Sequence, residues 1–350
     1  AGAGASQRPT VKVYDTGEVR SSVWGLYQRA VRAGADFVVG PLRKESVAVL
    51  ASAYRLEVPV LALNYVDQPE PPDTLYQFGL LPEDEARQAA ERAWFDGHER
   101  ALALAPAGTW GDRVVNAFRE RFEALGGRVV EEQRYDPQKS DFSRPITRML
   151  NLDESHARHR RLATLLKRKL SFKPRRRQDA DLVFTGAFPR QARLIRPQLR
   201  FHHASDLPVY ATSHVYQGHP RPAADRDMDG IVFCDTPWTL RPEGPAAALR
   251  AALSEHRGDA VRAQGRLYAL GVDAHDLIPY LQHLERDRYR RYTGVTGRLS
   301  MDPRRRLHRA LACARFEAGR PVLAPLAASP VGAPEGAAPE GPRDDAGPSL

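Results

Sequence analysis

The sequence has no run of 18 apolar residues, so no segment is long and apolar enough to cross a membrane as a helix. Its first residues, "AGAGASQRPT", lack both the charged start and the apolar stretch of a signal peptide. We therefore expect either a cytoplasmic protein or one whose export signal lies outside this sequence. Hydrophobic residues make up 42% of the 350 positions and charged residues 27%, which is typical of a globular protein with a sizeable core.

Cysteine is scarce, because the chain contains only Cys234 and Cys313. Two cysteines exclude a disulfide-rich scaffold, and their wide separation excludes a CxxC metal or redox site. We expect two buried thiols. The alternative is a single disulfide. The sequence cannot confirm it, because the separation of two cysteines along the chain does not determine the distance between them in space.

Motifs of catalysis and of nucleotide binding are also missing. There is no GxSxG, no Walker A sequence, and no GxGxxG after a predicted strand. The sequence therefore offers no catalytic residue and no cofactor site, and we interpret the chain as a non-enzyme.

Metal-site patterns are weak. The segment "DRDMDG" (225–230) matches the start of an EF-hand loop, but the position that needs a bidentate Glu is Thr236. We expect a polar turn there and no metal. Two histidine pairs lack the spacing or the carboxylates of a metal site: His156 with His159, and His202 with His203.

Short apolar runs alternate with amphipathic segments along the chain. Strands are predicted at 11–15 ("VKVYD"), 36–41, 58–64, 100–106, 128–135, 181–187, 207–213 and 229–235. Apolar strands separated by helices indicate parallel sheets covered on both faces. Roughly ten strands are too many for one short sheet, so two βαβ lobes are expected.

Several segments together carry a family resemblance. They include "GADFVVGPL", "FGLLPEDEARQAA", "RRRQDADLVF", "LPVYATSHVY" and "DTPW", in that order. Over about residues 11–323 the sequence resembles the LppC/LpoA family, the outer-membrane lipoprotein activators of class A penicillin-binding proteins. The resemblance implies an α/β fold of the type I periplasmic-binding-protein kind, with two doubly wound parallel-sheet lobes and a cleft between them.

The same resemblance implies a location and a partner. It places the protein in the periplasm, tethered to the outer membrane through a lipidated cysteine, and it implies stimulation of a class A penicillin-binding protein (a peptidoglycan synthase). Peptidoglycan itself is a further candidate partner. Membrane contact is implied only through the lipid anchor, which this sequence does not contain. The family pattern also has a strand and a helix before "VKVYD", so we expect an N-terminally truncated chain whose first lobe lacks them.

The order of the segments predicts where the lobes begin and end. We assign 10–82 with 238–290 to lobe one, and 83–237 with 291–325 to lobe two. The Pro-, Gly- and Ala-rich tail at 326–350 is expected to be disordered and dispensable for stability, because its composition has few apolar anchors.

Ligands of open parallel sheets bind beyond the carboxyl ends of the strands. These ends and their turns give seven candidate cleft-lining residues: Asp15, Gly40, Leu42, Asn64, Trp110, Gly186 and Ser213. Amino-acid-binding relatives of this fold carry Ser or Thr after the "GP" turn, where this chain has Leu42, Arg43 and Lys44. We expect an empty or solvent-filled cleft, and a solute-binding protein is the alternative function.

The densest positive charge lies at 158–177, where ten of 20 residues are basic in a chain of net charge +9. Arg175, Arg176 and Arg177 are candidates for docking an acidic partner. The alternatives are a solvated helix and loop, or pairing of part of the cluster with Asp179 and Asp181. Nucleic acid is not expected, because no recognition motif accompanies the charge.

Overall fold

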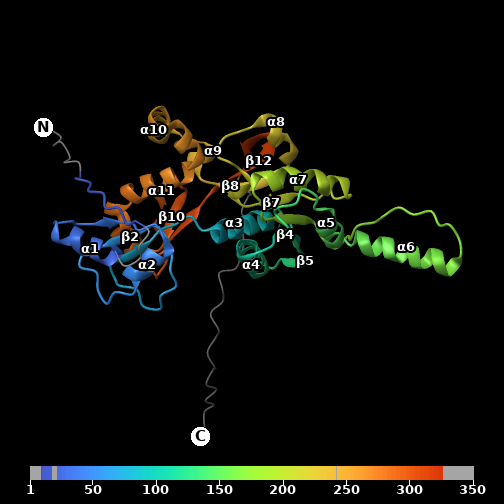
Figure 1. Cartoon of the computed structure of the whole chain (residues 1–350), viewed down its shortest axis with the longest axis horizontal. Helices are drawn as coiled ribbons and strands as arrows, with labels where there is room; N and C mark the ends of the chain where they lie inside the picture. Colours follow the sequence, from blue (N-terminus) through green and yellow to red (C-terminus); the bar gives the residue numbers. More distant parts are fainter. Residues whose placement is uncertain (1–8, 18–21, 242, 326–350) are drawn as a thin grey trace, which may run out of the picture.

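The computed structural model describes residues 9–17, 22–241 and 243–325. The described strands form one sheet of seven strands and two of three. Figure 1 shows two lobes side by side, with one helical arm projecting from the second lobe. No helix among the described residues is long and apolar enough to cross a membrane. The tail at 326–350, expected to be dispensable, lies outside the described residues.

Lobe one is built on a parallel sheet of order β1-β2-β3: Val38–Val39, Val60–Ala62 and Leu75–Gln77. Helices α1 (Ser22–Arg32) and α2 (Lys44–Ala51) pack against it. In α1, Val23, Tyr27 and Ala30 are buried, and their helical spacing places them on one face.

The strand predicted at 11–15 is not formed, and this prediction was wrong. Val11 is 73% exposed and Val13 is 90% exposed. Among the described residues β1 pairs only with β2, so this segment has no strand of lobe one beside it. Because a lone extended segment has no ladder of hydrogen bonds to join, 11–15 stays irregular.

Lobe two contains the seven-stranded sheet, of order β13-β12-β8-β7-β6-β4-β5. Its parallel part consists of β4 (Arg100–Pro106), β5 (Arg128–Tyr135), β6 (Leu182–Thr185), β7 (Val209–Ala211) and β8 (Ile231–Asp235). Both faces are covered. Helices α3 (Pro82–Phe95) and α4 (Thr109–Ala124) pack on one face, and α5 (Ser143–Met149) and α7 (Pro189–Phe201) pack on the other. In β4, Leu102 and Leu104 point to one core and Ala103 to the other, as the two-residue period of a strand requires.

Residues 291–311 lie with lobe one, not with lobe two as the sequence assignment had them. There β9 (Tyr292–Thr293), β10 (Arg298–Met301) and β11 (Leu307–Ala310) form an antiparallel sheet. Its apolar side chains share a core with β2, β3, α11 (Gly265–Asp276) and α12 (Leu281–Arg286). Only β12 (Ala312–Glu317) and β13 (Arg320–Leu323) join the larger sheet. We therefore propose that the last crossover between the lobes is at Leu311.

Four more helices lie in the described part of the chain. They are α6 (Leu152–Leu166), α8 (Pro222–Asp225), α9 (Pro237–Leu240) and α10 (Gly244–Ala263), with single 3-10 turns at Ser213–Val215, Arg226–Met228 and Ile278–Tyr280. Helix α10 bends at Arg257, whose backbone is not helical.

Cys234 and Cys313 form a disulfide, so the expectation of two thiols was wrong. The two residues face each other on β8 and β12, which pair antiparallel. They are 79 residues apart in sequence, and only the return of the chain from lobe one brings them together. The bond covalently fixes the last crossover to the sheet of lobe two.

Candidate functional site

The predicted cleft residues of lobe one cluster at the end of its sheet, except Asp15. Gly40 follows β1 and donates its N–H to the Leu61 carbonyl at 2.8 Å. Asn64 follows β2, and its side-chain amide donates to the Leu42 carbonyl at 2.9 Å. Asp15 lies in the irregular N-terminal segment, where its carboxylate accepts a hydrogen bond from the Gly17 N–H.

The predicted cleft residues of lobe two also come together. Trp110 opens α4, and its ring centroid lies 5.1 Å from that of His214. Gly186 follows β6, and a Cβ atom there would lie 3.5 Å from the Trp110 ring. Ser213 follows β7. Phe188, which is 43% exposed, completes a half-open aromatic cluster at 4.8 Å from Trp110.

The two groups line neither of two cavities found elsewhere among the described residues. The larger, of about 570 Å³, lies between α10 and α11 and is lined by residues such as Leu249 and Leu267. The smaller, of about 210 Å³, is bordered by 217–218 and 261–267. None of the seven predicted cleft residues lines them.

Buried charged side chains lie where the chain crosses between the lobes. Glu85 of α3 is 3% exposed, and its carboxylate accepts the Ser213 N–H at 3.1 Å. His214 Nδ1 lies 3.3 Å from the same oxygen. Burial alone would raise the pKa of Glu85, but the His214 hydrogen bond and the charges of Arg309 and Arg266 lower that pKa to about 2.

Arg266 joins the lobes directly. It lies on α11, and its Nε and Nη2 donate to the two oxygens of Asp235, at the end of β8, at 2.9 and 2.6 Å. Nη2 also donates to the carbonyls of Ser213 and Tyr216, both at 2.9 Å. Burial lowers the pKa of Arg266, but the Asp235 carboxylate offsets this and raises it above its ordinary value. A bidentate pair of this kind is both strong and geometrically specific.

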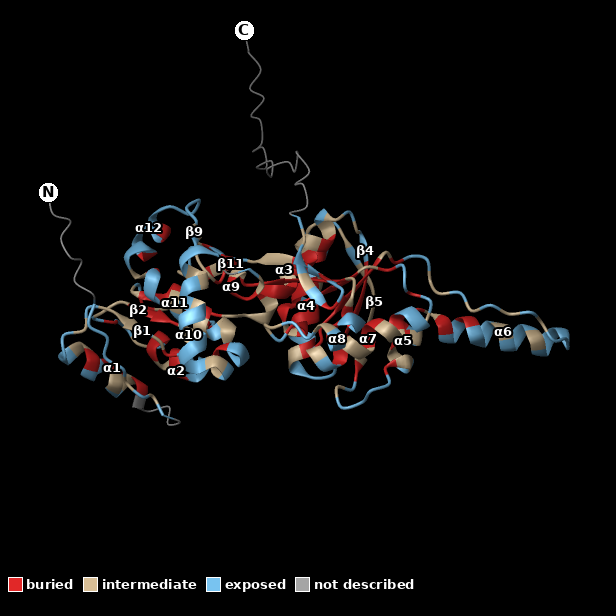
Figure 2. Ribbon diagram, turned by 90° about the horizontal axis from the view of Figure 1, so that it is seen from above, coloured by how far each residue is buried: buried red, intermediate tan, exposed pale blue. Residues whose placement is uncertain are grey.

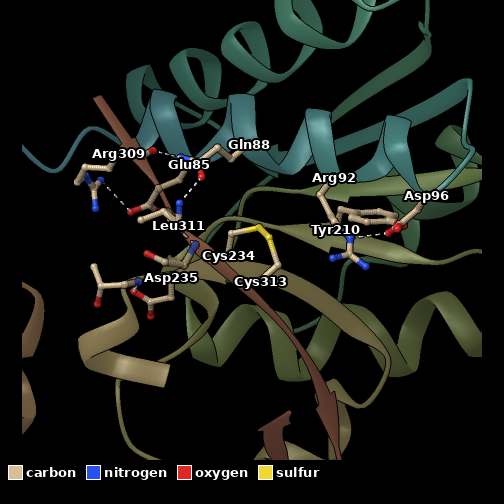
Figure 3. Close-up of a disulfide and its surroundings, with 12 residues drawn as sticks. Glu85, Gln88, Arg92, Asp96, Tyr210, Cys234, Asp235, Arg309, Leu311 and Cys313 are labelled. Atoms are coloured by element: carbon tan, nitrogen blue, oxygen red, sulfur yellow. Dashed lines mark hydrogen bonds and ion pairs between the residues drawn. A yellow bond between two sulfur atoms is a disulfide. The ribbon is translucent and has the colours of Figure 1, made fainter. Parts of the chain in front are cut away.

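Helix α3 also holds the last crossover. The Gln88 side chain donates to the Arg309 carbonyl at 2.7 Å and accepts the Leu311 N–H at 2.6 Å. The Arg309 side chain has no exposed surface, and its Nη2 lies 3.8 Å from Glu85. Figure 3 shows these side chains beside the Cys234–Cys313 disulfide, with the crossing strand between α3 and β8.

We call these residues the interlobe seam: Glu85, Gln88, Ser213, His214, Asp235, Arg266, Arg309 and Leu311. They come from α3, from the ends of β7 and β8, from α11 and from the β11–β12 crossover, so the seam joins residues of both lobes. Among the described residues no group of three or more His, Cys, Asp or Glu side chains is placed to hold a metal. The seam can fix one lobe against the other, which is a positioning role.

Sequence reasoning found Ser213 but missed the charged seam residues. Glu85 lies in the acidic first turn of α3, where acids normally serve the helix dipole at the surface. Nothing in the local pattern distinguishes it from Glu83, whose side chain is 18% exposed against 4% for Glu85.

The "DRDMDG" segment is engaged within the protein. Arg193 donates to the Asp225 carboxylate at 3.0 and 2.7 Å, and Asp229 accepts the Gly319 N–H at 2.8 Å. His156 and His159 both pack on Phe172, with ring centroids 5.0 and 4.2 Å away.

The three candidate docking arginines differ in exposure. The side chains of Arg176 and Arg177 are each 11% exposed, and they pair with Asp206 at 2.5 Å and with Asp179 at 2.7 Å. Arg175 is exposed and has no carboxylate partner among the residues described. These contacts favour the alternative in which part of the cluster packs within lobe two. The expected partner Asp181 instead binds the Arg100 N–H at 3.0 Å.

Comparison with protein families gives a match over residues 1–319 to the model described as "LppC putative lipoprotein". A protein of Vibrio antiquarius named "Penicillin-binding protein activator LpoA" is 31% identical over 301 residues, which are 84% of this chain and 48% of that protein. The chain thus spans about half the length of the curated relatives it matches.

Two solved structures are informative. One is described as "LpoA (YraM) C-domain from Haemophilus influenzae, a regulator of PBP1A"; it superposes with a TM-score of 0.69 at 27% identity, over 92% of this chain and 91% of that one. The other, from Chromobacterium violaceum, is described as a "putative branched-chain amino acid ABC transporter". It has a TM-score of 0.61 at 27% identity, over 87% of each chain. The expected fold of the type I periplasmic-binding-protein kind is confirmed.

Proposed function

This chain belongs to the LppC lipoprotein family, and from that premise we propose that it binds and stimulates a class A penicillin-binding protein without catalysing a reaction itself. The observation that carries the proposal is the correspondence, over nearly the whole of both chains, with the Haemophilus influenzae domain described as a regulator of PBP1A. We also propose a periplasmic location, with the full-length protein tethered to the outer membrane. The disulfide supports it, because such bonds persist in oxidising compartments.

The seam suggests how the domain would serve such a role. Buried ion pairs and a disulfide hold the crossovers, so the lobes would present a fixed surface to a partner. Complexes of preorganised proteins avoid the cost of ordering on binding. We propose that the seam maintains the binding shape and does not itself touch the partner.

Surface plasmon resonance tests the binding part of the proposal. The chain is immobilised, and a purified class A penicillin-binding protein from the same organism is passed over it, with a monofunctional transpeptidase as control. We expect saturable binding of the class A enzyme only. Equal responses from both enzymes, or none from either, would contradict the proposal.

The likeness to the Chromobacterium violaceum structure supports a second candidate, a solute-binding protein with a ligand between the lobes. The half-open cluster of Trp110, Phe188 and His214 would contact such a ligand. Calorimetry against amino acids and muropeptides tests it. Heat of binding that disappears in a Trp110→Ala variant would support the solute-binding function. The absence of any heat of binding would speak against it and leave activation of the synthase as the remaining candidate.

A further inference from the structure

A basic arm projects from lobe two, away from the seam. We define it as residues 152–174, helix α6 followed by an extended return segment. Figures 1 and 2 show it extending beyond the body of the lobe, with most of its surface exposed. Its base is anchored by the buried Leu152 and by hydrogen bonds from the Arg175 N–H to Ser155 and from the Arg177 N–H to the Leu150 carbonyl.

The arm is a defined hairpin. Helix α6 ends at Leu166, and the left-handed backbone of the C-cap residue Lys167 turns the chain back. On the return, the Phe172 ring stacks on His159 at 4.2 Å and meets the edge of His156 at 5.0 Å. One side of the helix is therefore covered by its own return segment.

The arm carries charge of one sign. Between 156 and 173 there are seven basic residues and no acidic one: Arg158, Arg160, Arg161, Lys167, Arg168, Lys169 and Lys173. All seven are exposed. Arg158 pairs with Glu154 at 3.5 Å, and the other six have no carboxylate within ion-pair distance in the described part of the chain.

Helix α6 also carries three exposed leucines. Leu162, Leu165 and Leu166 are 50%, 71% and 57% exposed. Their spacing of three and four places them on one helical face, which begins beside His159, because Leu162 and Leu166 follow that residue by three and seven positions. Arg158 and Arg161 precede the leucines, and Lys167, Arg168 and Lys169 follow them.

We propose that the arm docks on the surface of an anionic phospholipid membrane, with its leucines at the acyl boundary and its cations at the headgroups. An apolar face bordered by Lys and Arg is typical of helices that lie in a bilayer interface. A protein partner fits less well: residues 152–174 contain no Trp and no Tyr, the aromatic anchors of protein interfaces, and their exposed large apolar residues are leucines, which are under-represented at the energetic centres of such interfaces.

Sedimentation with vesicles tests the proposal on the whole chain. The vesicles are made of an equimolar mixture of phosphatidylcholine and phosphatidylglycerol, or of phosphatidylcholine alone. We expect binding to the anionic vesicles at low salt, weakening as salt rises, and none to the neutral ones. Replacing Lys167, Arg168 and Lys169 by Gln should lower the partition coefficient on the order of a hundredfold.

Two further variants distinguish the effect of the arm on vesicle binding from the effect of the protein's net charge. Arg286→Gln, Arg288→Gln and Arg290→Gln together remove three exposed charges elsewhere, so this variant should lose much less binding. Leu162→Ala, Leu165→Ala and Leu166→Ala together keep every charge and should lower binding on the order of tenfold. Thermal melts check that each variant is folded.

Three outcomes would overturn the proposal. They are an absence of binding to anionic vesicles at low salt, an equal loss in the 167–169 and 286–290 variants, and equal binding to neutral vesicles. If vesicles do not bind but the arm variants weaken capture by the synthase, the arm serves a protein partner instead.

Discussion

The Arg266 guanidinium of lobe one donates two hydrogen bonds, of 2.9 and 2.6 Å, to the fully buried Asp235 carboxylate of lobe two. The same guanidinium binds two carbonyls that follow β7. One side chain thus connects α11 to the ends of two strands in the other lobe.

Replacing Arg266 by Met should therefore cost about 3–5 kcal/mol of unfolding free energy, because it leaves a buried carboxylate without its partner. Urea denaturation measures the loss. Adding Asp235→Asn should recover part of it, since the stranded charge is removed. The matched control is Arg241→Met, from an ion pair whose side chains are 67% and 65% exposed, where the change should be about 0–1 kcal/mol. Equal losses in the two Met variants would show that the seam pair contributes no more than a surface pair.

The disulfide gives a second test. Replacing Cys234 and Cys313 by Ala should lower the unfolding free energy by about 2–5 kcal/mol, because the bond restrains the unfolded chain over a separation of 79 residues. A reducing agent should destabilise the wild type and leave the double variant unchanged. A wild type that melts identically with and without reductant would contradict this.

The low pKa of Glu85 predicts how stability depends on pH. Because folding lowers this pKa from 4.5 to about 2, the folded state favours the charged carboxylate. The stabilisation, of about 3 kcal/mol, is fully present above the unfolded pKa and is lost as pH falls through the folded one. Denaturation of Glu85→Gln at pH values from about 5 down to 2 should show a shallower decline than the wild type. The control Glu243→Gln, at a side chain that is 65% exposed, should keep the wild-type slope.

Gly294 lies in the turn before β10, against Asp273. A Cβ atom there would lie 2.4 Å from the Asp273 carboxylate, which accepts the N–H groups of Val295 and Thr296 at 2.8 Å each. Gly294→Ala should therefore cost about 1–3 kcal/mol, as measured by denaturant unfolding. Gly271→Ala, within α11 and with nothing within 4 Å of the added carbon, should instead be neutral or stabilising. A larger loss of stability in Gly271→Ala than in Gly294→Ala would contradict the packing described.

Arg175 and Arg177 should differ in how much their replacement changes the stability of the protein. Arg177→Gln should lower stability by about 1 kcal/mol, since it removes the pair with Asp179, which is itself 58% exposed. Arg175→Gln should leave the thermal melt unchanged. If Arg175 steers docking, its variant should slow association with the synthase, and the defect should shrink at high salt. A loss of stability in the Arg175 variant alone would contradict this division.

The parallel strands of the fold could be predicted because their signal is local: runs such as 100–106 and 229–235 are apolar in themselves. The charged residues of the interlobe seam could not be predicted from the sequence, because a buried glutamate such as Glu85 has the same local sequence context as an exposed one. The disulfide could not be predicted either, because β8 and β12 pair only after the intervening chain has passed through lobe one. The segment 11–15 has the composition of a strand, but a strand also needs a neighbour.

The rate of glycan strand synthesis by a class A penicillin-binding protein, measured with and without the chain, tests the central claim most directly. The wild-type chain should raise the rate to a plateau as its concentration increases. The Arg266→Met variant, whose lobes are no longer fixed, should raise it less at a temperature where it remains folded. An unchanged synthesis rate at saturating wild-type chain would contradict the proposed function.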